Sequence, residues 1–388
     1  MADGLVDLDK CLLKHHVRTD GWLPVCKNRR KQIQAGVPEK HKRRVRYFTF
    51  CAVGAIDVLM LEVAKVIVKS QADAFDTVSY FDRDQQSVFE TSKRIPGANG
   101  FVGEFIDTVL ADDPEPVEED ATQGDEGDHP LAIPESETDT AATRERKRKL
   151  SVRRDFIKKF PFDIINLDLE EFLFKPSDPM PGRVINAMRR VFHWQKRSLY
   201  HPPKSNQGRP LDGFSLMFTT QIGPPKLTDD YLSMLRNELT TNLDGNAQLA
   251  PILVQRGGDL DVAKLEESNF DLFFKLGMPK VIARTLLAED WYIDPDVGIK
   301  LYEFERPSKD GPYKMLHLVT DVKRQSPPDN LRIPNSIAPT AQQAYSQVVA
   351  ALFQNREILV NDTTIDKTTL QANLDKIKSR RKKYYPDE

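Results

Sequence analysis

Residues 47–110 alternate apolar strands with helices, and this alternation restricts the fold more than any other feature of the sequence. The pattern predicts, in order, strand, helix, strand, helix and strand over 47–52, 56–68, 77–81, 85–94 and 100–106. Apolar strands separated by helices of this length are typical of a parallel sheet that is covered on both faces.

Later segments extend the same sheet. Further strands are expected at 162–169 and 213–219, with a helix at 183–198 between them. Two alternating strands, 298–305 and 313–323, flank a Pro- and Gly-containing turn, which predicts a hairpin. The fold class is therefore α/β: a doubly wound, mostly parallel sheet with a C-terminal antiparallel hairpin and helical insertions.

The chain of 388 residues divides by composition into three parts. Residues 1–46 form a basic N-terminal arm, for which we expect a short helix over 6–14 and then an extended segment with Trp22 as a packing anchor. Its charged residues either belong to a solvated segment that precedes the first strand or form a binding surface for phosphates. The main domain spans 47–323 and carries a helical insertion at 243–290. The end, 324–388, is expected to be a helical basic tail.

The segment 112–143 stands apart from its surroundings. It holds about a dozen carboxylates between 112 and 140, without a Lys or Arg in that stretch, and has almost nothing to bury. Such a composition predicts a disordered acidic insertion within the main domain.

Cysteines and apolar runs restrict the compartment. The three cysteines are scattered without CxxC spacing, which favours a reducing compartment and argues against a zinc or disulfide framework, so no metal site is expected. No apolar run approaches the roughly 20 residues of a membrane helix, and the N-terminus lacks the apolar core of a signal peptide. The sequence therefore predicts a cytoplasmic protein without membrane contact.

Polar residues follow the predicted strands where ligands collect in such sheets, at the carboxyl ends. Asp82 ends the second strand, where a carboxylate commonly accepts hydrogen bonds from a ribose, so a nucleoside-containing ligand is the first hypothesis. The alternative is that acids here cap the following helix. Gly54 is either a ligand-binding turn or a tight connection, and Asp57 either caps the first helix or reaches a charged end of the ligand.

Asn166 and Asp168 end the buried strand 162–169. Burying two polar side chains there costs desolvation free energy unless each has a hydrogen-bond partner. They are candidates for chemistry, and the alternative for Asp168 is a structural bond to the next loop.

Basic residues cluster on two predicted helices. Clustered Lys and Arg give sequence-independent affinity for phosphates, so we expect nucleic acid as a partner. The alternatives are solvated helix faces and neutralisation of the acidic segment. The residues are Lys147, Arg148, Lys149, Arg153, Arg154, Arg189 and Arg190.

Five strand–helix units followed by a hairpin resemble the class I S-adenosylmethionine-dependent methyltransferases. Four stretches lie where that family keeps its motifs: the turn from Cys51 to Asp57, Asp82 with Asp84, Gly103-Glu104-Phe105, and Asn166-Leu-Asp168. The resemblance implies that S-adenosylmethionine is the cofactor. Its implied ligands are Gly54, Asp57, Asp82 and Glu104, and the implied groups that orient an acceptor amine are Asn166 and Asp168.

The sequence also departs from the family pattern. Only Gly54 remains of the usual Gly-x-Gly, with Ala52 and Ala55 beside it, and Ala does not adopt positive φ cheaply. Leu167 and Leu169 stand where prolines and an aromatic residue are usual, so the face on which an extruded base would stack is missing.

Two hypotheses follow. The first is an enzyme that methylates, or a related protein that binds, nucleic acid. The second is a catalytically degenerate methyltransferase fold that acts as a scaffold subunit with other proteins, for example in a bacterial antiviral defence complex.

Overall fold

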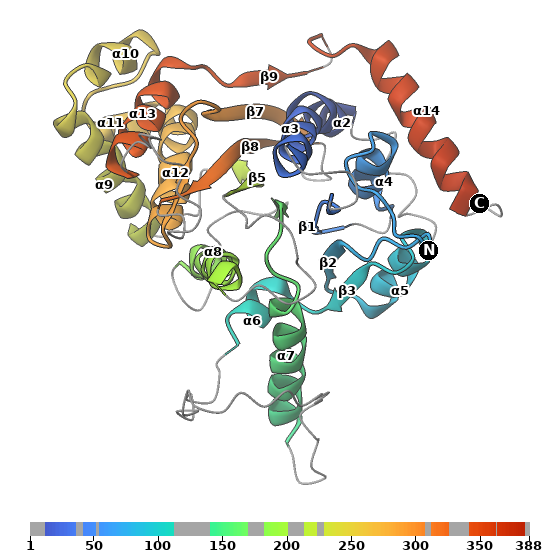
Figure 1. Ribbon diagram of the computed structural model, residues 1–388. Helices are drawn as coiled ribbons and strands as arrows, with labels where there is room; N and C mark the ends of the chain where they lie inside the picture. The colour runs from blue at the N-terminus through green and yellow to red at the C-terminus, as the bar shows by residue number, and fades with distance from the viewer. Residues whose placement is uncertain are drawn as a thin grey trace.

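A mixed nine-stranded sheet forms the centre of the molecule (Figure 1). The computed structural model describes residues 12–35, 42–51, 54–111, 140–169, 182–200, 213–222, 229–306, 312–325, 341–361 and 363–384. Along the sheet the strands are β3 (Asn99–Val102), β2 (Val78–Asp82), β1 (Tyr47–Thr49), β4 (Ile164–Asp168), β5 (Gly213–Ile222), β8 (Tyr313–Arg324), β7 (Ile299–Arg306) and β9 (Ile358–Val360), and β6 (Trp291–Ile293) pairs with β8. An α/β fold is confirmed.

One strand in this order, β8, runs against its neighbours on both sides. Strands β3, β2, β1, β4 and β5 run parallel, whereas β8 runs antiparallel to β5, β6 and β7. The predicted hairpin is thus confirmed as β7–β8. Strand β9 pairs in parallel with β7.

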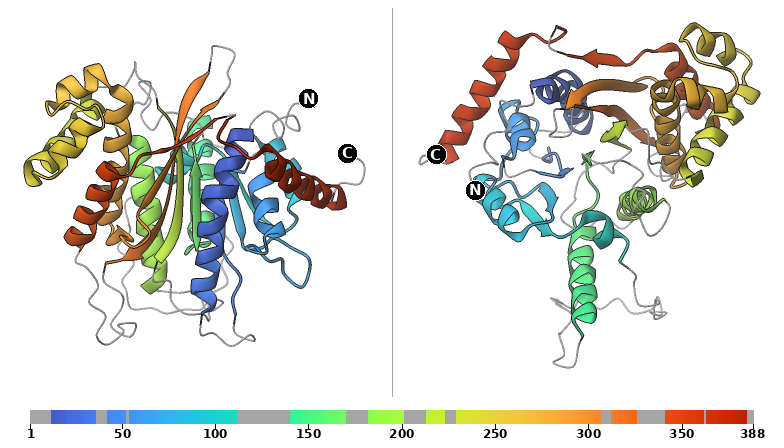
Figure 2. Two further views of the ribbon diagram at one scale, coloured as in Figure 1. Left: turned by 90° about the horizontal axis from the view of Figure 1, so that it is seen from above. Right: turned by 180° about the vertical axis from the view of Figure 1, so that it is seen from behind.

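Helices cover both faces of the sheet, and each face has its own apolar core (Figure 2). One core involves α6 (Phe105–Val109), α7 (Ala141–Ile157), α8 (Arg183–Tyr200), α9 (Asp229–Gly245), α10 (Leu249–Gln255), α11 (Val262–Ser268), α12 (Phe270–Leu287) and α13 (Ala341–Gln354). The other involves α2 (Leu12–His16), the π-helical turn η2 (Val17–Trp22), α3 (Leu23–Gln34), α4 (Ile56–Val63), α5 (Gln85–Arg94) and α14 (Lys367–Tyr384). Continuous apolar strands are expected in a sheet that is buried on both sides.

The N-terminal segment is helical over 12–14 as expected, whereas the expectation of an extended arm is wrong over 15–34. These residues are helical and lie against the sheet. Pro24 does not interrupt the helices because it lies in the first turn of α3, where its missing N–H is not needed. Trp22 is an anchor as expected, with 1% of its surface exposed.

Two left-handed residues shorten predicted elements. The third strand ends at Val102 because Gly103 adopts φ 143°, and α6 begins at Phe105. The first helix ends at Val63, shortly before Lys65 with φ 58°, rather than at residue 68. Positive φ does not fit a strand or a right-handed helix.

The remaining expected segments are partly described. Most of the acidic insertion, 112–143, lies outside the described residues, and α7 begins at its end, capped by Thr140. The segment 243–290 is largely helical, but α12 is buried in the main core rather than lying apart. The predicted tail adds β9 to the sheet and packs α14 on α4.

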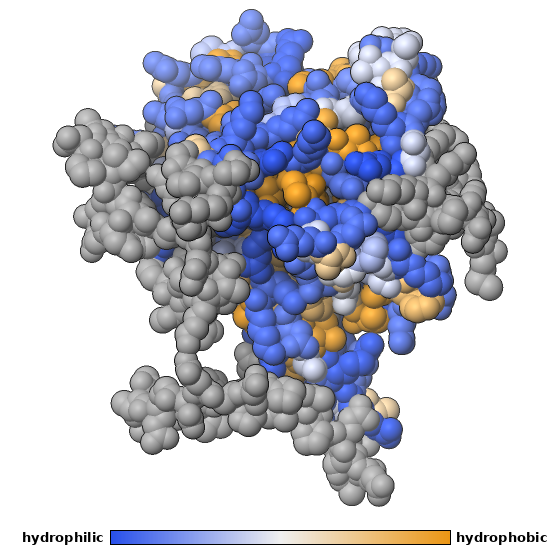
Figure 3. All heavy atoms as spheres, turned by 45° about the vertical axis from the view of Figure 1, so that its right-hand side comes forward, coloured by the Kyte–Doolittle hydropathy of each residue, from blue (hydrophilic) through white to orange (hydrophobic). Residues whose placement is uncertain are grey.

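The described surface carries many polar groups. On the face drawn in Figure 3, hydrophobic areas lie among more extensive hydrophilic ones. Within the described ranges, none of the helices has the length and apolar content needed to cross a membrane.

Candidate functional site

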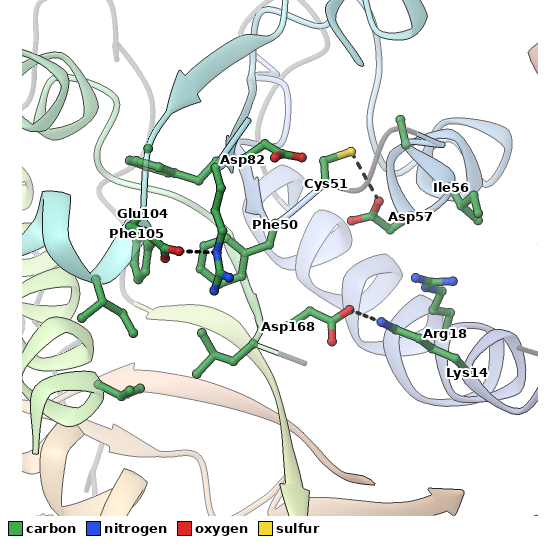
Figure 4. Close-up of a pocket in the computed structure, with 17 residues that line it drawn as sticks. Lys14, Arg18, Phe50, Cys51, Ile56, Asp57, Asp82, Glu104, Phe105 and Asp168 are labelled. Carbon is green, nitrogen blue, oxygen red and sulfur yellow. Dashed lines mark hydrogen bonds and ion pairs between the residues drawn. The ribbon is translucent and has the colours of Figure 1, made fainter. Parts of the chain in front are cut away.

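A cavity of about 490 Å³ lies at the carboxyl ends of β1, β2 and β4. Four residues expected to bind a ligand or act in chemistry line it, namely Asp57, Asp82, Glu104 and Asp168 (Figure 4). These residues come from four separate elements of the first 168 residues. The parallel sheet brings them together because its strand ends share one edge.

Asp82 lies at the end of β2. Its Oδ1 accepts a hydrogen bond from the backbone N–H of Asp84 at 3.0 Å, which leaves the carboxylate only partly occupied by protein donors. Burial raises the pKa of Asp82 above its usual range. Asp84 does not line the cavity. Its side chain caps α5 by accepting from the N–H of Ser87 at 2.8 Å.

Glu104 lies opposite, directly before α6. Its Oε1 pairs with Arg83 Nε at 2.5 Å, and both side chains are largely exposed at the cavity. Arg83 follows Asp82 in the chain, so the ion pair connects the ends of β2 and β3. Exposed pairs of this kind are worth about 0–1 kcal/mol, and a ligand could displace this one at little cost.

Three phenylalanines form an apolar wall beside this pair. Phe105 contacts Phe50 with ring centroids 4.8 Å apart and Phe81 with centroids 5.3 Å apart, both edge to face. All three line the cavity. Edge-to-face aromatic pairs hold their geometry, so the wall offers a fixed apolar surface to a flat ring.

Asp57 lies in the first turn of α4 and is buried. Its Oδ2 accepts from the hydroxyls of Tyr47 and Thr49, each at 2.7 Å. Asn166 donates through Nδ2 to the same hydroxyl oxygens, at 3.2 and 3.1 Å. Asn166 itself is buried behind this layer and does not line the cavity. It therefore orients Asp57 through two hydroxyls.

Asp168 ends β4 and faces the N-terminal helices. Its Oδ2 pairs with Lys14 Nζ at 2.6 Å, and both side chains are buried. Burial alone would raise the pKa of Asp168, but the positive charges of Lys14 and Arg18 outweigh it and hold the pKa below its usual value. Asp168 is thus an ionised carboxylate that already forms an ion pair with Lys14.

Lys14 and Arg18 were not expected at this site. They lie about one helical turn apart on α2 and η2, and both line the cavity. Their signal in the sequence is weak, because cations one turn apart look like a solvated helix face. Only the apolar Val17 and Trp22 beside them indicate that the helix packs on the sheet.

The turn after β1 keeps Gly54 buried, but Gly54 does not line the cavity. The left-handed residue is Ala55, with φ 47° and ψ 31°, directly before α4. A non-glycine residue in this conformation costs on the order of 1 kcal/mol. The turn therefore forms at a cost that a glycine would avoid, and Ala55 lines the cavity in its place.

The basic residues expected to bind nucleic acid differ in how far protein contacts occupy them. Five have protein partners: Arg148 with Glu145, Lys149 with Asp107, Arg153 with the Ala111 carbonyl, Arg189 with Glu289, and Arg190 with the Val109 carbonyl. Arg153 is also buried. Lys147 also interacts with the protein and is half-buried, whereas Arg154 is exposed; both lie on α7, which extends away from the sheet (Figure 1).

In the part of the chain that the structure describes, no group of three or more His, Cys, Asp or Glu side chains is placed to hold a metal ion. Comparison of the chain with protein-family models, with curated proteins and with solved structures gave no match.

Proposed function

We propose that the protein is methyltransferase-like and that its cavity binds S-adenosylmethionine. The observation that carries the proposal is the cavity at the carboxyl ends of β1, β2 and β4, with Asp82 at the end of β2. The strand order 3-2-1-4-5, followed by one antiparallel strand between β5 and β7, supports it, since this is the order expected of the class I family.

The cavity chemistry fits such a ligand. Its volume lies within the roughly 300–1,000 Å³ of small-molecule sites. Asp82 can accept hydrogen bonds from ribose hydroxyls, and Glu104 can accept one from an adenine amino group while Phe105 contacts the ring. Asp57 lies near the other side, where a ligand ammonium would find a carboxylate oxygen.

The bound cofactor would supply an electrophilic methyl group. On the protein side, Asp168 reaches the cavity and is the residue expected to face the methyl acceptor. Its carboxylate would accept a hydrogen bond from an amine while it remains paired with Lys14. Asn166 acts behind Asp57 rather than on an acceptor. We therefore assign cofactor binding to Asp57, Asp82 and Glu104, and orientation of an acceptor to Asp168.

The second candidate function is a scaffold that no longer transfers methyl groups. Three observations favour it: Ala55 occupies the left-handed turn position, Arg83 already pairs with Glu104, and Asn166 is buried. Such a protein would dock nucleic acid or other subunits, for example within an antiviral assembly.

Titration calorimetry with S-adenosylhomocysteine tests the first function. We expect micromolar binding that Asp82→Ala weakens at least about 10-fold, because hydrogen bonds to a charged acceptor are lost. The matched control is Asp84→Asn, two residues away and outside the cavity, because Asn keeps the cap of α5. If the wild-type protein shows no heat with either the cofactor or its product, the scaffold function remains.

Nucleic-acid binding is tested by its dependence on salt. We expect affinity for duplex DNA or RNA to fall steeply with salt and the double variant Lys147→Glu/Arg154→Glu to reduce it at least about 10-fold, since each lost phosphate contact lowers the slope by about one. A matched double reversal at exposed lysines of other helices, Lys264→Glu/Lys376→Glu, should have little effect. Affinity that does not change with salt would show that α7 is a solvated helix.

A further inference from the structure

The inner side of the cavity holds two cations, Lys14 and Arg18, and two carboxylates, Asp57 and Asp168. Asp168 pairs directly with Lys14 at 2.6 Å. Asp57 accepts hydrogen bonds from Tyr47 and Thr49 instead, so neither carboxylate at this end forms an ion pair with Arg18.

Arg18 is the cation that remains available. It forms no ion pair with any described residue, and its Nε is buried without a hydrogen-bond partner among them. The guanidinium lies 5.4 Å from the ring centroid of Trp22, which holds it without satisfying its donors. A buried guanidinium nitrogen without a partner is costly, and a planar anion with two oxygens would satisfy it.

The two ends of the cavity differ in chemistry. Glu104 and Phe105 lie on one side, with Arg18 and Lys14 on the opposite side (Figure 4). A ligand with a nucleoside against the first side therefore extends its other end toward the cations. The carboxylates Asp57 and Asp168 lie beside the cations, so this end accepts a positive group together with a negative one.

We propose that Arg18, supported by Lys14, binds the carboxylate of the ligand's amino-acid end and so selects adenosyl ligands that carry one. The inference rests on the proposed function, because it assumes an adenosyl group at Asp82. It makes the helical segment 12–22, which contributes Lys14 and Arg18 to the cavity wall, the element that distinguishes the amino-acid-bearing cofactor from shorter nucleosides.

The test measures by calorimetry the binding of S-adenosylhomocysteine and 5′-methylthioadenosine, with adenosine monophosphate as a third probe. S-Adenosylhomocysteine carries the amino-acid end and 5′-methylthioadenosine lacks it. The variant is Arg18→Gln, since replacing Lys14 would leave Asp168 buried and unpaired and could prevent folding. Lys27→Gln is the matched control because it removes one positive charge from the same helical segment at an exposed position outside the cavity.

We expect Arg18→Gln to weaken S-adenosylhomocysteine about 10- to 100-fold and to leave 5′-methylthioadenosine unchanged. Equal binding of S-adenosylhomocysteine to Arg18→Gln and wild type would overturn the inference while leaving the proposed function intact. Adenosine monophosphate binding more tightly than S-adenosylhomocysteine would also overturn it, in favour of a phosphate. If neither adenosyl probe binds the wild-type protein, the proposed function fails, and the inference fails with it.

Discussion

Replacing Trp22 with alanine is expected to lower the free energy of unfolding by about 4 kcal/mol, the usual cost of emptying a site of this size in a core. The side chain is 1% exposed, and its Nε1–H donates to His317 Nε2. Because Trp only donates, His317 must accept with Nε2 and donate with Nδ1 to Thr219 Oγ1, at 2.6 Å. Burial and the charges of Lys14 and Arg18 hold the pKa of His317 far below its usual value, which keeps the ring neutral.

Urea unfolding checks this prediction, with Trp22→Phe as the matched control. Phenylalanine keeps most of the volume and loses only the hydrogen bond to His317, so a loss of about 1–2 kcal/mol is expected. Since Trp22 fixes the helix that carries Lys14 and Arg18, the alanine variant should also bind adenosyl ligands more weakly. A loss below about 1 kcal/mol for alanine would mean that the N-terminal helix is not anchored through Trp22.

The second large effect is expected at Lys280, where replacement by methionine should stabilise the protein. Lys280 lies in α12 with 0% of its surface exposed, and its Nζ has no hydrogen-bond partner among the described residues. Nζ lies 4.5 Å from the ring centroid of Phe353. Burial lowers the pKa of Lys280 to about 7, against a partial opposing effect of Glu238. Methionine has a similar length and no charge to desolvate.

The pH dependence of this effect has a defined sign. The folded-state pKa is about 7, and the unfolded value is about 10.4. Below pH 7 both states carry the proton, and the burial penalty is fully present, on the order of 4–5 kcal/mol from the difference between the two pKa values. Between these two pKa values the unfolded state binds more protons, so the stability of the wild-type protein rises with pH. The advantage of Lys280→Met should therefore be largest at or below neutral pH and shrink toward pH 9.

Thermal or urea unfolding of both proteins at pH 7 and pH 9 measures this difference. Lys264→Met is the control, because Lys264 is an exposed lysine on α11 whose replacement should change stability by less than about 0.5 kcal/mol at either pH. A stability gap between Lys280→Met and wild type that stays constant from pH 7 to pH 9 would contradict the assignment. So would a destabilised methionine variant.

The sheet could be predicted largely because its information is local. Strands such as β4 are continuous apolar runs, and the β7–β8 hairpin is marked by its turn. Boundaries were less accurate where a single residue adopts positive φ, as Gly103 does after β3. The periodic pattern of apolar residues does not determine the φ angle of Gly103, so the predicted strand, 100–106, overlaps the start of α6.

The site was predictable only where it depends on strand ends. Asp82 and Asp168 come to one cavity because parallel strands share an edge, which the order of elements implies. Lys14 contacts Asp168 across more than 150 positions of the chain, and no local pattern encodes such a pairing. Asn166 was expected in the cavity because it precedes Asp168 by two residues, yet the hydroxyls of Tyr47 and Thr49 lie between it and Asp57.

The hydrogen bond between Trp22 and His317 can form only late in synthesis, after β8 has been made. Its partners are 295 positions apart, so η2 leaves the ribosome long before β8 exists to receive it. Domains emerge from their N-termini at about 5–20 residues per second, so the helix waits on the order of tens of seconds for its anchor. A nascent chain that stops before β8 would carry the strands of the cavity but lack this anchor for its closing wall.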